Sequence, residues 1–415
     1  MKANTDIIMI LLWGGMATTV FGAEGVRVLP DSAEAIGLIG GRFTLLDDPS
    51  VVRTNPASLS KINSPALQVN FQAWEGDTDF TRLDGATGSM IENWKFLGGI
   101  NYVHPINDDL TVGFGISAPF GLSMNWDSNG LFRYIAPYDA LLQTAAFSPA
   151  FGYRVNDRLS IGAGLDIYYS TVTLDQAFPW AAVVGPGAVD GDMVFDGDGW
   201  GLGGFLGINY SPVDGHTFAL TARLPVKVDY DGDFSITNLP AALAGTFSPT
   251  SPFDSEIEYP GSIGIGYGWE VNDSLTIGID FEWIQNSTHD DVPLLIGANQ
   301  PLLGGATGID LDWNDSFSVG IGAEYEVSKN LTLRAGYLYS ESPLKGSTYT
   351  PVVPANDRHI FSVGAGYTSG ANTIDVAYAY MPMENLSVNN ASQPGYNGSY
   401  EFDWHILALS YTRTF

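Results

Sequence analysis

The sequence predicts an all-β protein: a transmembrane β-barrel of 14 antiparallel strands with an N-terminal plug, or hatch, inside its lumen. Three observations predict this fold: strands in which apolar and polar side chains alternate, polar turns that recur along the chain, and an unusual composition. Charged residues make up 15% of the 415 residues, against roughly 25% in soluble proteins, whereas glycine and aromatic residues are both abundant. Such a composition is unusual for a water-soluble enzyme.

The overall charge excludes one class of partner. With 17 Lys and Arg against 46 Asp and Glu, the net charge is −29 at pH 7. A chain this acidic repels phosphate backbones, so nucleic acid is excluded as a partner. Because the chain contains no Cys, disulfides, thiolate metal sites and cysteine nucleophiles are excluded as well.

The first 23 residues have the features of a secretory signal peptide. Lys2 precedes an apolar stretch over residues 7–17, and the small residues Gly22 and Ala23 suit cleavage by signal peptidase. Beyond residue 23 no run of about 18 apolar residues occurs, so we expect no membrane-spanning helix in the mature chain. We therefore assign residues 1–23 to a signal peptide.

Polar turns set the strand arrangement. They occupy residues 105–110, 155–159, 212–216, 271–275, 327–331 and 368–372. Their Asn, Asp and Gly residues tolerate positive φ, which is typical of tight hairpins. Successive turns are too far apart for single hairpins, so short turns should alternate with long loops. Six hairpins supply twelve strands, and one strand near residues 66–74 and another ending at Phe415 complete 14.

The predicted strands have one apolar and one polar face. In residues 110–117, Leu110, Val112, Phe114 and Ile116 share a face opposite Thr, Gly and Ser. The pattern recurs at 159–168, 275–282, 317–324 and 374–379. A soluble sandwich would carry more Lys, Glu and Arg on its outer face, whereas an outer-membrane barrel turns its apolar face to lipid. We expect a multi-pass barrel in the outer membrane of a Gram-negative bacterium.

The segment before the first strand has a different character. Residues 24–65 contain no alternating strand, although they follow the signal peptide and precede the barrel of residues 66–415. Because an empty 14-stranded barrel would leak, we expect residues 24–65 to plug the lumen. The C-terminal Phe415 ends an aromatic and apolar stripe like the signal that outer-membrane assembly machinery reads.

Several motifs are similar to those of one family. Residues 35–42, 47–50 and 55–59 match its N-terminal hatch, residues 119–122 with 133–134 and then 148–153 match its third and fourth strands, and residues 333–337 and 354–367 match its last third. The mature chain thus resembles the FadL-type transporters of long-chain fatty acids and hydrocarbons (OMPP1/FadL/TodX). The matching hatch residues are Arg42, Asp47, Asp48, Asn55, Pro56 and Ala57. Two loops, around residues 190–198 and 288–314, match nothing in the family pattern.

The resemblance implies passive uptake of hydrophobic compounds. Outer loops would capture the ligand, a pocket in the barrel would hold it, and a kinked strand would release it sideways into the bilayer. No cofactor is implied, and the expected partners are hydrophobic small molecules, outer-membrane lipid, lipopolysaccharide and the assembly machinery. The alternative is a porin for small polar solutes, which would need an open constriction lined by charges of both signs and no plug.

The stretch from Pro119 to Leu142 is the predicted capture loop, because it has a heavy apolar load. Its candidate ligand-binding residues are Phe120, Leu122, Met124, Trp126, Phe132 and Tyr134. The alternative is that this loop folds down and packs on itself or on the plug. Aromatic and Met side chains would suit an adaptable pocket.

The remaining candidate site residues are charged. Arg223, Arg334 and Arg358 could hold a carboxylate headgroup, or they could belong to a structural network with acids that face the lumen. Asp47 and Asp48 could anchor the plug to the barrel. The acids Asp190, Asp192, Asp196 and Asp198 could take Ca²⁺ from an outer loop, although solvated charge or cation bridging to lipopolysaccharide explains them as well.

The histidines argue against catalysis. The chain has five His, and His405 on the last strand stands where a barrel phospholipase would place one. The neighbouring strands present no Ser beside it, so a nucleophile is missing. We expect no enzymatic activity.

Overall fold

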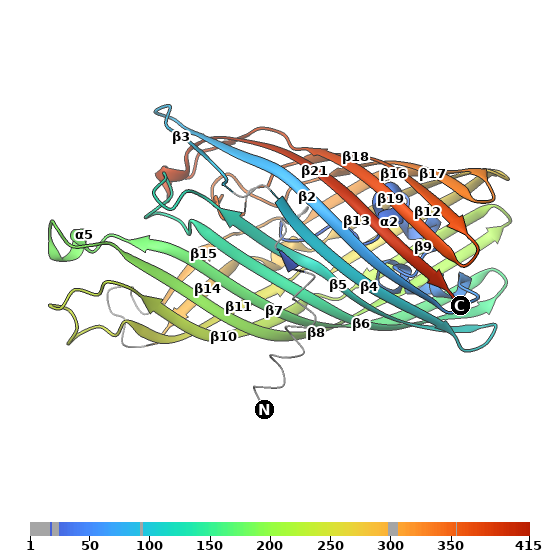
Figure 1. Cartoon of the computed structure of the whole chain (residues 1–415), viewed down its shortest axis with the longest axis horizontal. Coiled ribbons are helices and arrows are strands. Elements are labelled where there is room, and N and C mark those ends of the chain that lie inside the picture. The colour runs from blue at the N-terminus through green and yellow to red at the C-terminus, as the bar shows by residue number, and fades with distance from the viewer. Residues whose placement is uncertain (1–16, 19–24, 92–93, 298–305, 354) are drawn as a thin grey trace.

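The computed structural model describes residues 17–18, 25–91, 94–297, 306–353 and 355–415. It is a closed antiparallel barrel of 14 strands, as the sequence predicts (Figure 1). The barrel closes where the first and last wall strands pair in register from Ala66 opposite Thr414 to Arg82 opposite Gly398. No helix among the described residues is long and apolar enough to cross a membrane. Of the predicted signal peptide, only residues 17–18 fall within the described ranges.

The wall strands follow one another around the barrel, each paired with the next. In order, they are β2 (Ala66–Arg82), β4 (Trp94–Pro105), β5 (Leu110–Asn125), β6 (Asp139–Asn156), β7 (Leu159–Phe178), β8 (Gly191–Val213), β9 (His216–Arg223), β12 (Ser262–Asn272), β13 (Leu275–Ile284), β16 (Ser316–Ser328), β17 (Leu331–Ser340), β18 (Arg358–Ser369), β19 (Asn372–Pro382) and β21 (Gly398–Thr414).

The remaining strands are short or extend the wall at one end. They are β1 (Ala17–Thr18), β3 (Thr87–Ser89), β10 (Val226–Ile236), β11 (Thr250–Tyr259), β14 (Asp291–Ile296), β15 (Ala306–Asp310) and β20 (Leu386–Val388). The helices are α2 (Ala33–Gly37), α3 (Arg42–Leu45), α4 (Val51–Thr54), η1 (Pro56–Lys61), α5 (Ala181–Val184), η2 (Asn286–Thr288) and η4 (Pro394–Tyr396).

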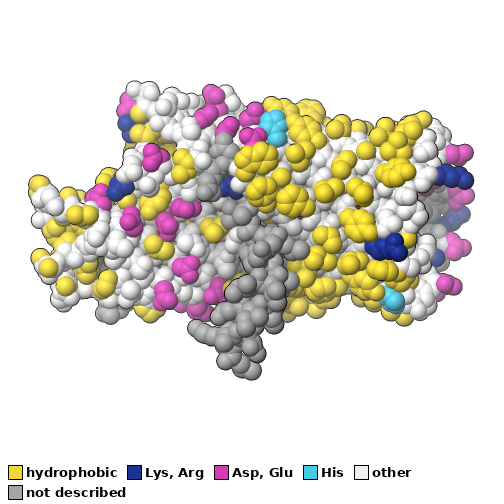
Figure 2. All heavy atoms as spheres, viewed as in Figure 1, with side chains coloured by type: hydrophobic (Ala, Val, Ile, Leu, Met, Phe, Trp, Pro, Cys, Tyr) yellow, Lys and Arg dark blue, Asp and Glu magenta, His cyan; other side chains and the backbone are white. Residues whose placement is uncertain are grey.

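The faces of the wall strands are reversed relative to those of a soluble protein, with polar side chains inside and apolar side chains outside. On β2, Gln68 and Asn70 are buried, whereas Val69 and Phe71 are exposed on the outside, at 42% and 46%. Polar side chains thus face the lumen and apolar ones face outward, as a bilayer requires. Figure 2 shows the hydrophobic side chains gathered over one half of the barrel and acidic side chains over much of the other half.

All six predicted turns join neighbouring wall strands at one end of the barrel, which we call the turn end. Gly215 and Gly370 lie in two of these turns with φ of 76° and 62°, a conformation that glycine adopts without strain. The opposite end, with α5 and the longer connections, is the loop end (Figure 1).

The two loops that matched nothing in sequence are in large part strand. Residues 191–198 begin β8, and β14 and β15 form a hairpin within residues 288–314. The loop-end half of β8 pairs with β10, which pairs in turn with β11, and β11 pairs with β14. The wall therefore continues beyond β9 and β12 as a sheet at the loop end.

The N-terminal segment, residues 25–65, lies inside the barrel. Helix α2 contacts β18 and β19, α3 contacts β12 and β13, and η1 contacts β6, β7 and β8. Wall glycines permit this close packing: a Cβ at Gly162 or Gly207 would collide with Pro56 or Asn55 of the segment. These contacts on several sides of the wall place residues 25–65 across the lumen.

Candidate functional site

One arginine ties the N-terminal segment to the wall near the turn end. Arg334 of β17 contacts Glu34 of α2 at 3.3 Å, Glu324 of β16 at 2.7 Å and Asp375 of β19 at 2.7 Å. Its side chain is 8% exposed. A planar guanidinium can serve several carboxylates at once, so Arg334 joins three elements. The geometry is that of a structural network.

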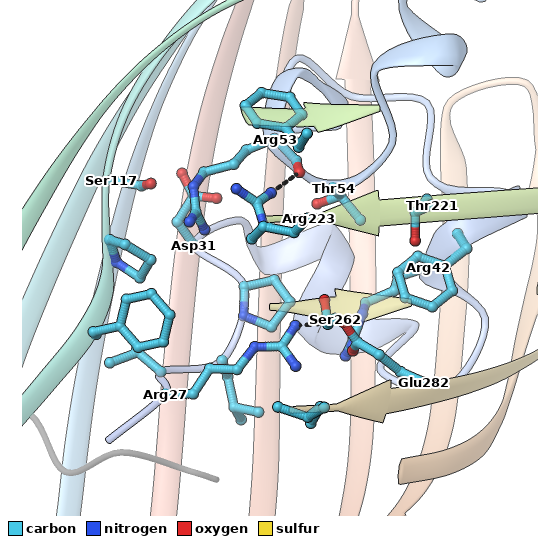
Figure 3. Close-up of a pocket in the computed structure, with 18 of the residues that line it drawn as sticks. Arg27, Asp31, Arg42, Arg53, Thr54, Ser117, Thr221, Arg223, Ser262 and Glu282 are labelled. Carbon is cyan, nitrogen blue, oxygen red and sulfur yellow. Dashed lines mark hydrogen bonds and ion pairs between the residues drawn. The ribbon is translucent and has the colours of Figure 1, made fainter. Parts of the chain in front are cut away.

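Further arginines line a cavity of ≈90 Å³ beside β5, shown in Figure 3. Arg27 and Arg42 share the carboxylate of Glu282, at 2.8 and 2.6 Å. Arg53 and Arg223 share Asp166 in the same way, and Arg223 also donates to the Arg53 carbonyl at 2.7 Å. These two groups have four guanidiniums for two shared carboxylates. Asp31 also lines the cavity, so four guanidiniums meet three carboxylates there. The one remaining positive charge makes the cavity suited to an anionic group.

Three other predicted site residues, two in the N-terminal segment and one in the wall, differ in their contacts. Asp48 accepts a hydrogen bond from Gln68 of β2 at 2.7 Å, so it does contact the wall. The Asp47 side chain is exposed, and its backbone N–H donates to Glu34 at 3.1 Å. Arg358 begins β18, fully buried, at the loop end.

Asn55 connects three parts of the segment with β8. Its amide nitrogen donates to the Phe43 carbonyl and to Asn209 of β8, both at 2.8 Å, and its oxygen accepts from the Ala57 N–H as the cap of η1. Pro56 follows at the first helical position, where its missing N–H costs nothing. The Asn-Pro-Ala motif is thus a capped turn docked on the wall.

Replacing Asn55 with Ala is expected to destabilise the barrel by about 1–3 kcal/mol, because the buried partners on Phe43 and Asn209 lose their hydrogen bonds. Thermal unfolding followed by circular dichroism in detergent measures the effect. Asn63→Ala is the control, because Asn63 is exposed and its amide bonds to the nearby Lys61 carbonyl. Equal melting temperatures for Asn55→Ala and the wild type would contradict the docking role.

Two further cavities follow one another from the loop end inward. The outer cavity, of ≈560 Å³, is lined by residues such as Tyr134, Ile135 and Tyr396. The inner pocket, of ≈60 Å³, is lined by twelve Val, Leu and Ile residues and His289. Both cavities share Leu174, Ile309 and Val352, so they adjoin. A fourth cavity, of ≈720 Å³ and rich in acids, lies at the turn end, on the other side of the N-terminal segment.

The wall is not continuously paired between β4 and β5. Their ladder ends at Ile100 opposite Ile116, and pairing resumes only at the Met90–Trp126 bridge. Within the described residues between these points, β4 pairs with β2 and with β1, which belongs to the predicted signal peptide. The β5 edge bonds instead to residues 26–28 of the N-terminal segment. We call this section the β4–β5 gap.

A bulge in β5 lies at the edge of the gap. Opposite β6, Ser117 pairs with Ala146 and Phe120 with Thr144, so β5 carries one extra residue, and the bulge includes Pro119. Proline has no N–H for a ladder, which suits a strand edge that does not pair with the next wall strand. The arginine-lined cavity opens against this bulge, because Ser117, Ala118, Pro119 and Phe120 line it.

The predicted capture loop is wrong in its first part. Phe120, Leu122 and Met124 belong to β5 and are buried at 3%, 5% and 0%. The proline that suggested a strand end marks the bulge. The structure places Phe120 at the arginine-lined cavity, Leu122 in the inner pocket and Tyr134 in the outer cavity.

Two more of the predicted capture residues are buried in the core. Trp126 and Phe132 pack edge to face, with ring centroids 4.7 Å apart, and Trp126 donates to the Pro351 carbonyl at 3.2 Å. Neither they nor Met124 line the described cavities. This interior packing agrees with the alternative stated above, in which the stretch packs on the protein instead of capturing ligand.

The suggested calcium site is also not formed. Asp192, Asp196 and Asp198 lie on the outer face of strand β8, not in a loop, and Asp190 pairs with Arg133 at 3.1 Å. Alternate residues of a strand are about 7 Å apart, so their carboxylates do not converge. Over the described ranges, no group of three or more His, Asp or Glu side chains could hold a metal ion.

The sequence does not single out His289, because a lone loop histidine has many roles. In the structure its ring is 4% exposed and lines the inner pocket, and burial lowers its pKa to about 4. It is therefore neutral at physiological pH. Only the tertiary contact with twelve aliphatic residues distinguishes His289 from the other four histidines.

Comparisons with known proteins agree with the fold. A family model described as "Outer membrane protein transport protein (OMPP1/FadL/TodX)" matches residues 15–415. A long-chain fatty acid transport protein of Escherichia coli O6:H1 is 24% identical over 393 residues, which cover 86% of this chain and 87% of that protein. A putative outer membrane protein of Neisseria meningitidis serogroup B is 26% identical over 460 residues, 98% of each chain.

Solved structures resemble the whole barrel. A FadL homologue of Pseudomonas aeruginosa superposes with a TM-score of 0.83 at 21% identity, covering 94% of this chain and 99% of that one. The toluene transporter TodX of Pseudomonas putida has a TM-score of 0.71 at 17% identity, covering 95% and 99%. At these identities the likeness shows the fold.

Proposed function

The chain belongs to the OMPP1/FadL/TodX family of outer membrane transport proteins, and from this premise we propose that it takes up hydrophobic compounds passively and releases them sideways through the β4–β5 gap. Short turns of such barrels face the periplasm, so the loop end faces the exterior. The observation that carries the proposal is the series of cavities between the loop end and the section of wall where β4 and β5 do not pair with each other.

The pathway begins in the outer cavity. Its lining includes Tyr134, Phe178 and Tyr396, which offer apolar surface at the loop end. A hydrophobic solute gains about 25 cal/mol for each Å² of apolar surface that leaves water, so this surface favours capture. The shared lining residues then lead to the inner pocket, which is drier and smaller.

Release is proposed at the bulge of β5. The gap offers a way out at the level where side chains such as Phe96 and Phe114 face lipid, at 38% and 41% exposure. A solute that leaves there avoids both the polar lipopolysaccharide layer and the acidic cavity at the turn end. An ionised headgroup would meet compensating charge at the arginine-lined cavity, where Arg27 is the more accessible partner of Glu282.

The N-terminal segment supports a plugged channel over an open porin. Its helices contact the wall on several sides, and Arg334 and Asn55 fasten it there. The named similar proteins are transport proteins, which supports transport and not catalysis. Recognition of the exposed Phe415 by assembly machinery, and contact of the loop-end acids with lipopolysaccharide, belong to the same proposal.

The substrate class follows the named relatives. One is a long-chain fatty acid transport protein and another a toluene transporter. Proteoliposomes containing the purified chain should take up radiolabelled oleate or toluene faster than empty liposomes, and should not conduct ions as an open porin does. Rapid passage of ions or small sugars without hydrophobic uptake would favour the porin.

Leu174→Gln is expected to lower uptake about tenfold, because Leu174 lines both the outer cavity and the inner pocket and a buried amide without partners is costly. Initial uptake rates in proteoliposomes measure this. Thr171→Gln is the control, because Thr171 lies on the same strand but on the opposite face. If both variants transport at the wild-type rate, the solute does not pass between these two cavities.

A further inference from the structure

The inner pocket contains one polar side chain without a partner. Twelve of its lining residues are Val, Leu or Ile, and the thirteenth is His289. The His289 ring is 4% exposed, and neither of its nitrogens has a hydrogen-bond partner among the described residues. Buried polar atoms are paired in the great majority of cases, so an unpaired imidazole in an aliphatic pocket requires an explanation.

The backbone around His289 is ordered and directs its ring into the inner pocket. The wall strand β13 ends at Ile284, and η2 then turns the chain inward before β14 begins at Asp291. The backbone N–H of His289 donates to the Asn286 carbonyl at 2.9 Å. The His289 carbonyl accepts from the backbone N–H of Trp313 at 3.2 Å. The backbone is thus satisfied, and only the ring nitrogens are left open.

The ring itself is held in one orientation. It stacks on Trp313 with centroids 4.7 Å apart and an interplanar angle of 23°. Asn286 of the same turn is fixed by a hydrogen bond of 2.8 Å to Ser316 of β16. A stacked ring on a fixed turn cannot swing away to find a partner, so the partner has to come to it.

A second unpaired group lies along the same route. The hydroxyl of Tyr349, a residue 1% exposed, has no hydrogen-bond partner in the described part of the chain. Tyr349 lines the outer cavity together with Val352, which also lines the inner pocket. Two open hydrogen-bonding groups therefore follow one another from the outer cavity to the inner pocket.

The chemistry of the open groups selects the ligand. A neutral imidazole presents one donor and one acceptor, as a hydroxyl group does, so the two complement each other. A carboxylate only accepts, and its charge would be buried beside no cation of the pocket lining. A plain hydrocarbon would leave both ring nitrogens unpaired.

We propose that the inner pocket binds a hydrophobic compound that carries one neutral hydroxyl group, an alcohol or a phenol, with this hydroxyl hydrogen-bonded to His289. The aliphatic residues hold the body of the ligand. This inference rests on the proposed uptake function and narrows its substrate class. Ionised headgroups would instead be served by the arginine-lined cavity at the β4–β5 gap.

The test compares p-cresol with toluene, which differ by one hydroxyl group, in the full chain and in His289→Phe. Titration calorimetry in lipid nanodiscs, with empty nanodiscs as the blank, gives the four affinities. The wild type should bind p-cresol about tenfold more tightly than toluene, and His289→Phe should remove this preference while still binding toluene. Phenylalanine keeps the stack on Trp313, so toluene binding shows that the pocket is intact. The same preference in both proteins would overturn the inference.

A spectroscopic measurement reports on the ring directly. In protein labelled with ¹⁵N-histidine, His289 is one of five histidines and is assigned by its absence in His289→Phe. Saturating p-cresol should shift the His289 ring nitrogens, whereas toluene should leave their hydrogen-bonding state unchanged. Unshifted ring nitrogens at saturating p-cresol would contradict the hydrogen bond.

Uptake measurements distinguish failure of the proposed uptake function from failure of the proposed role of His289. If neither p-cresol nor toluene enters proteoliposomes faster than it enters empty liposomes, the proposed uptake function fails. If both enter at equal rates and His289→Phe changes neither their uptake nor their affinity ratio, uptake stands and the role of His289 is wrong.

Discussion

Deleting Pro119 is expected to reduce uptake by about tenfold or more while the barrel still assembles. Ser117 and Phe120 both face the lumen because Ala118 and Pro119 together oppose one residue of β6. Removing one residue keeps both side chains inside and lets β5 pair with β4 beyond Ile116. Each backbone hydrogen bond added across the gap contributes about 1 kcal/mol, and two of them lower the open population roughly thirtyfold.

The matched variant is Pro119→Ala, which restores an N–H but keeps the extra residue. It should retain most of the uptake, because the bulge and not the missing donor sets the gap. Initial rates of oleate or toluene uptake in proteoliposomes measure both variants, and the mobility shift of the unheated barrel in gels checks assembly. Full uptake by an assembled deletion variant would mean that release occurs elsewhere, for instance through the turn-end cavity.

Replacing Arg334 with Leu is expected to release helix α2 from the wall and to open the lumen to ions. The change leaves Glu34, Glu324 and Asp375 close together without their shared cation. Removing one partner of a buried ion pair costs about 3–5 kcal/mol. Conductance in planar bilayers should rise from a closed baseline to a steady leak.

Arg334→Lys separates charge from geometry. A lysine ammonium supplies one positive charge but not the planar fork that reaches three carboxylates, so an intermediate leak is expected. Arg158→Leu is the control on the same end of the barrel, because Arg158 is exposed and bonds to a turn carbonyl. A closed baseline in Arg334→Leu would show that other contacts, such as those of Asn55, suffice to hold the segment.

The barrel could be predicted from sequence because its signals are local. Alternation along residues 110–117 reports which face of a strand meets lipid, and Asn, Asp and Gly report where a chain reverses. These signals located all six short turns and the 14 strands of the wall. They did not locate the sheet of β10, β11, β14 and β15. In β10 the side chains do alternate, but the apolar ones are buried and the charged ones face outward, which is the reverse of the wall strands.

The site was less predictable, because its residues gain their roles from distant partners. Alternation places Arg223 and Arg334 in the lumen together with acids such as Asp166, and the structure pairs Arg223 with Asp166. The sequence does not show which arginine meets which acid, nor that Glu34 of α2 contacts Arg334. The sequence marks Phe120 and Leu122 as apolar but predicts a loop for them, because Pro119 resembles a strand end although it marks a bulge. His289 carried no signal at all.

The sequence by itself determined the class of fold, the direction in which each strand faces, the turns and the resemblance to a family, because all of these follow from the order of side chains along short stretches. The tertiary structure alone decided where the wall is left unpaired, which arginines share a carboxylate, and which histidine is enclosed by aliphatic side chains. Those features depend on closure of the barrel around its N-terminal segment, which brings together residues more than 200 positions apart, as Arg42 and Glu282 show. Closure encloses the inner pocket, where an unpaired imidazole is costly because water cannot satisfy it. Closure also decides where two wall strands fail to pair. No short stretch of sequence shows either feature.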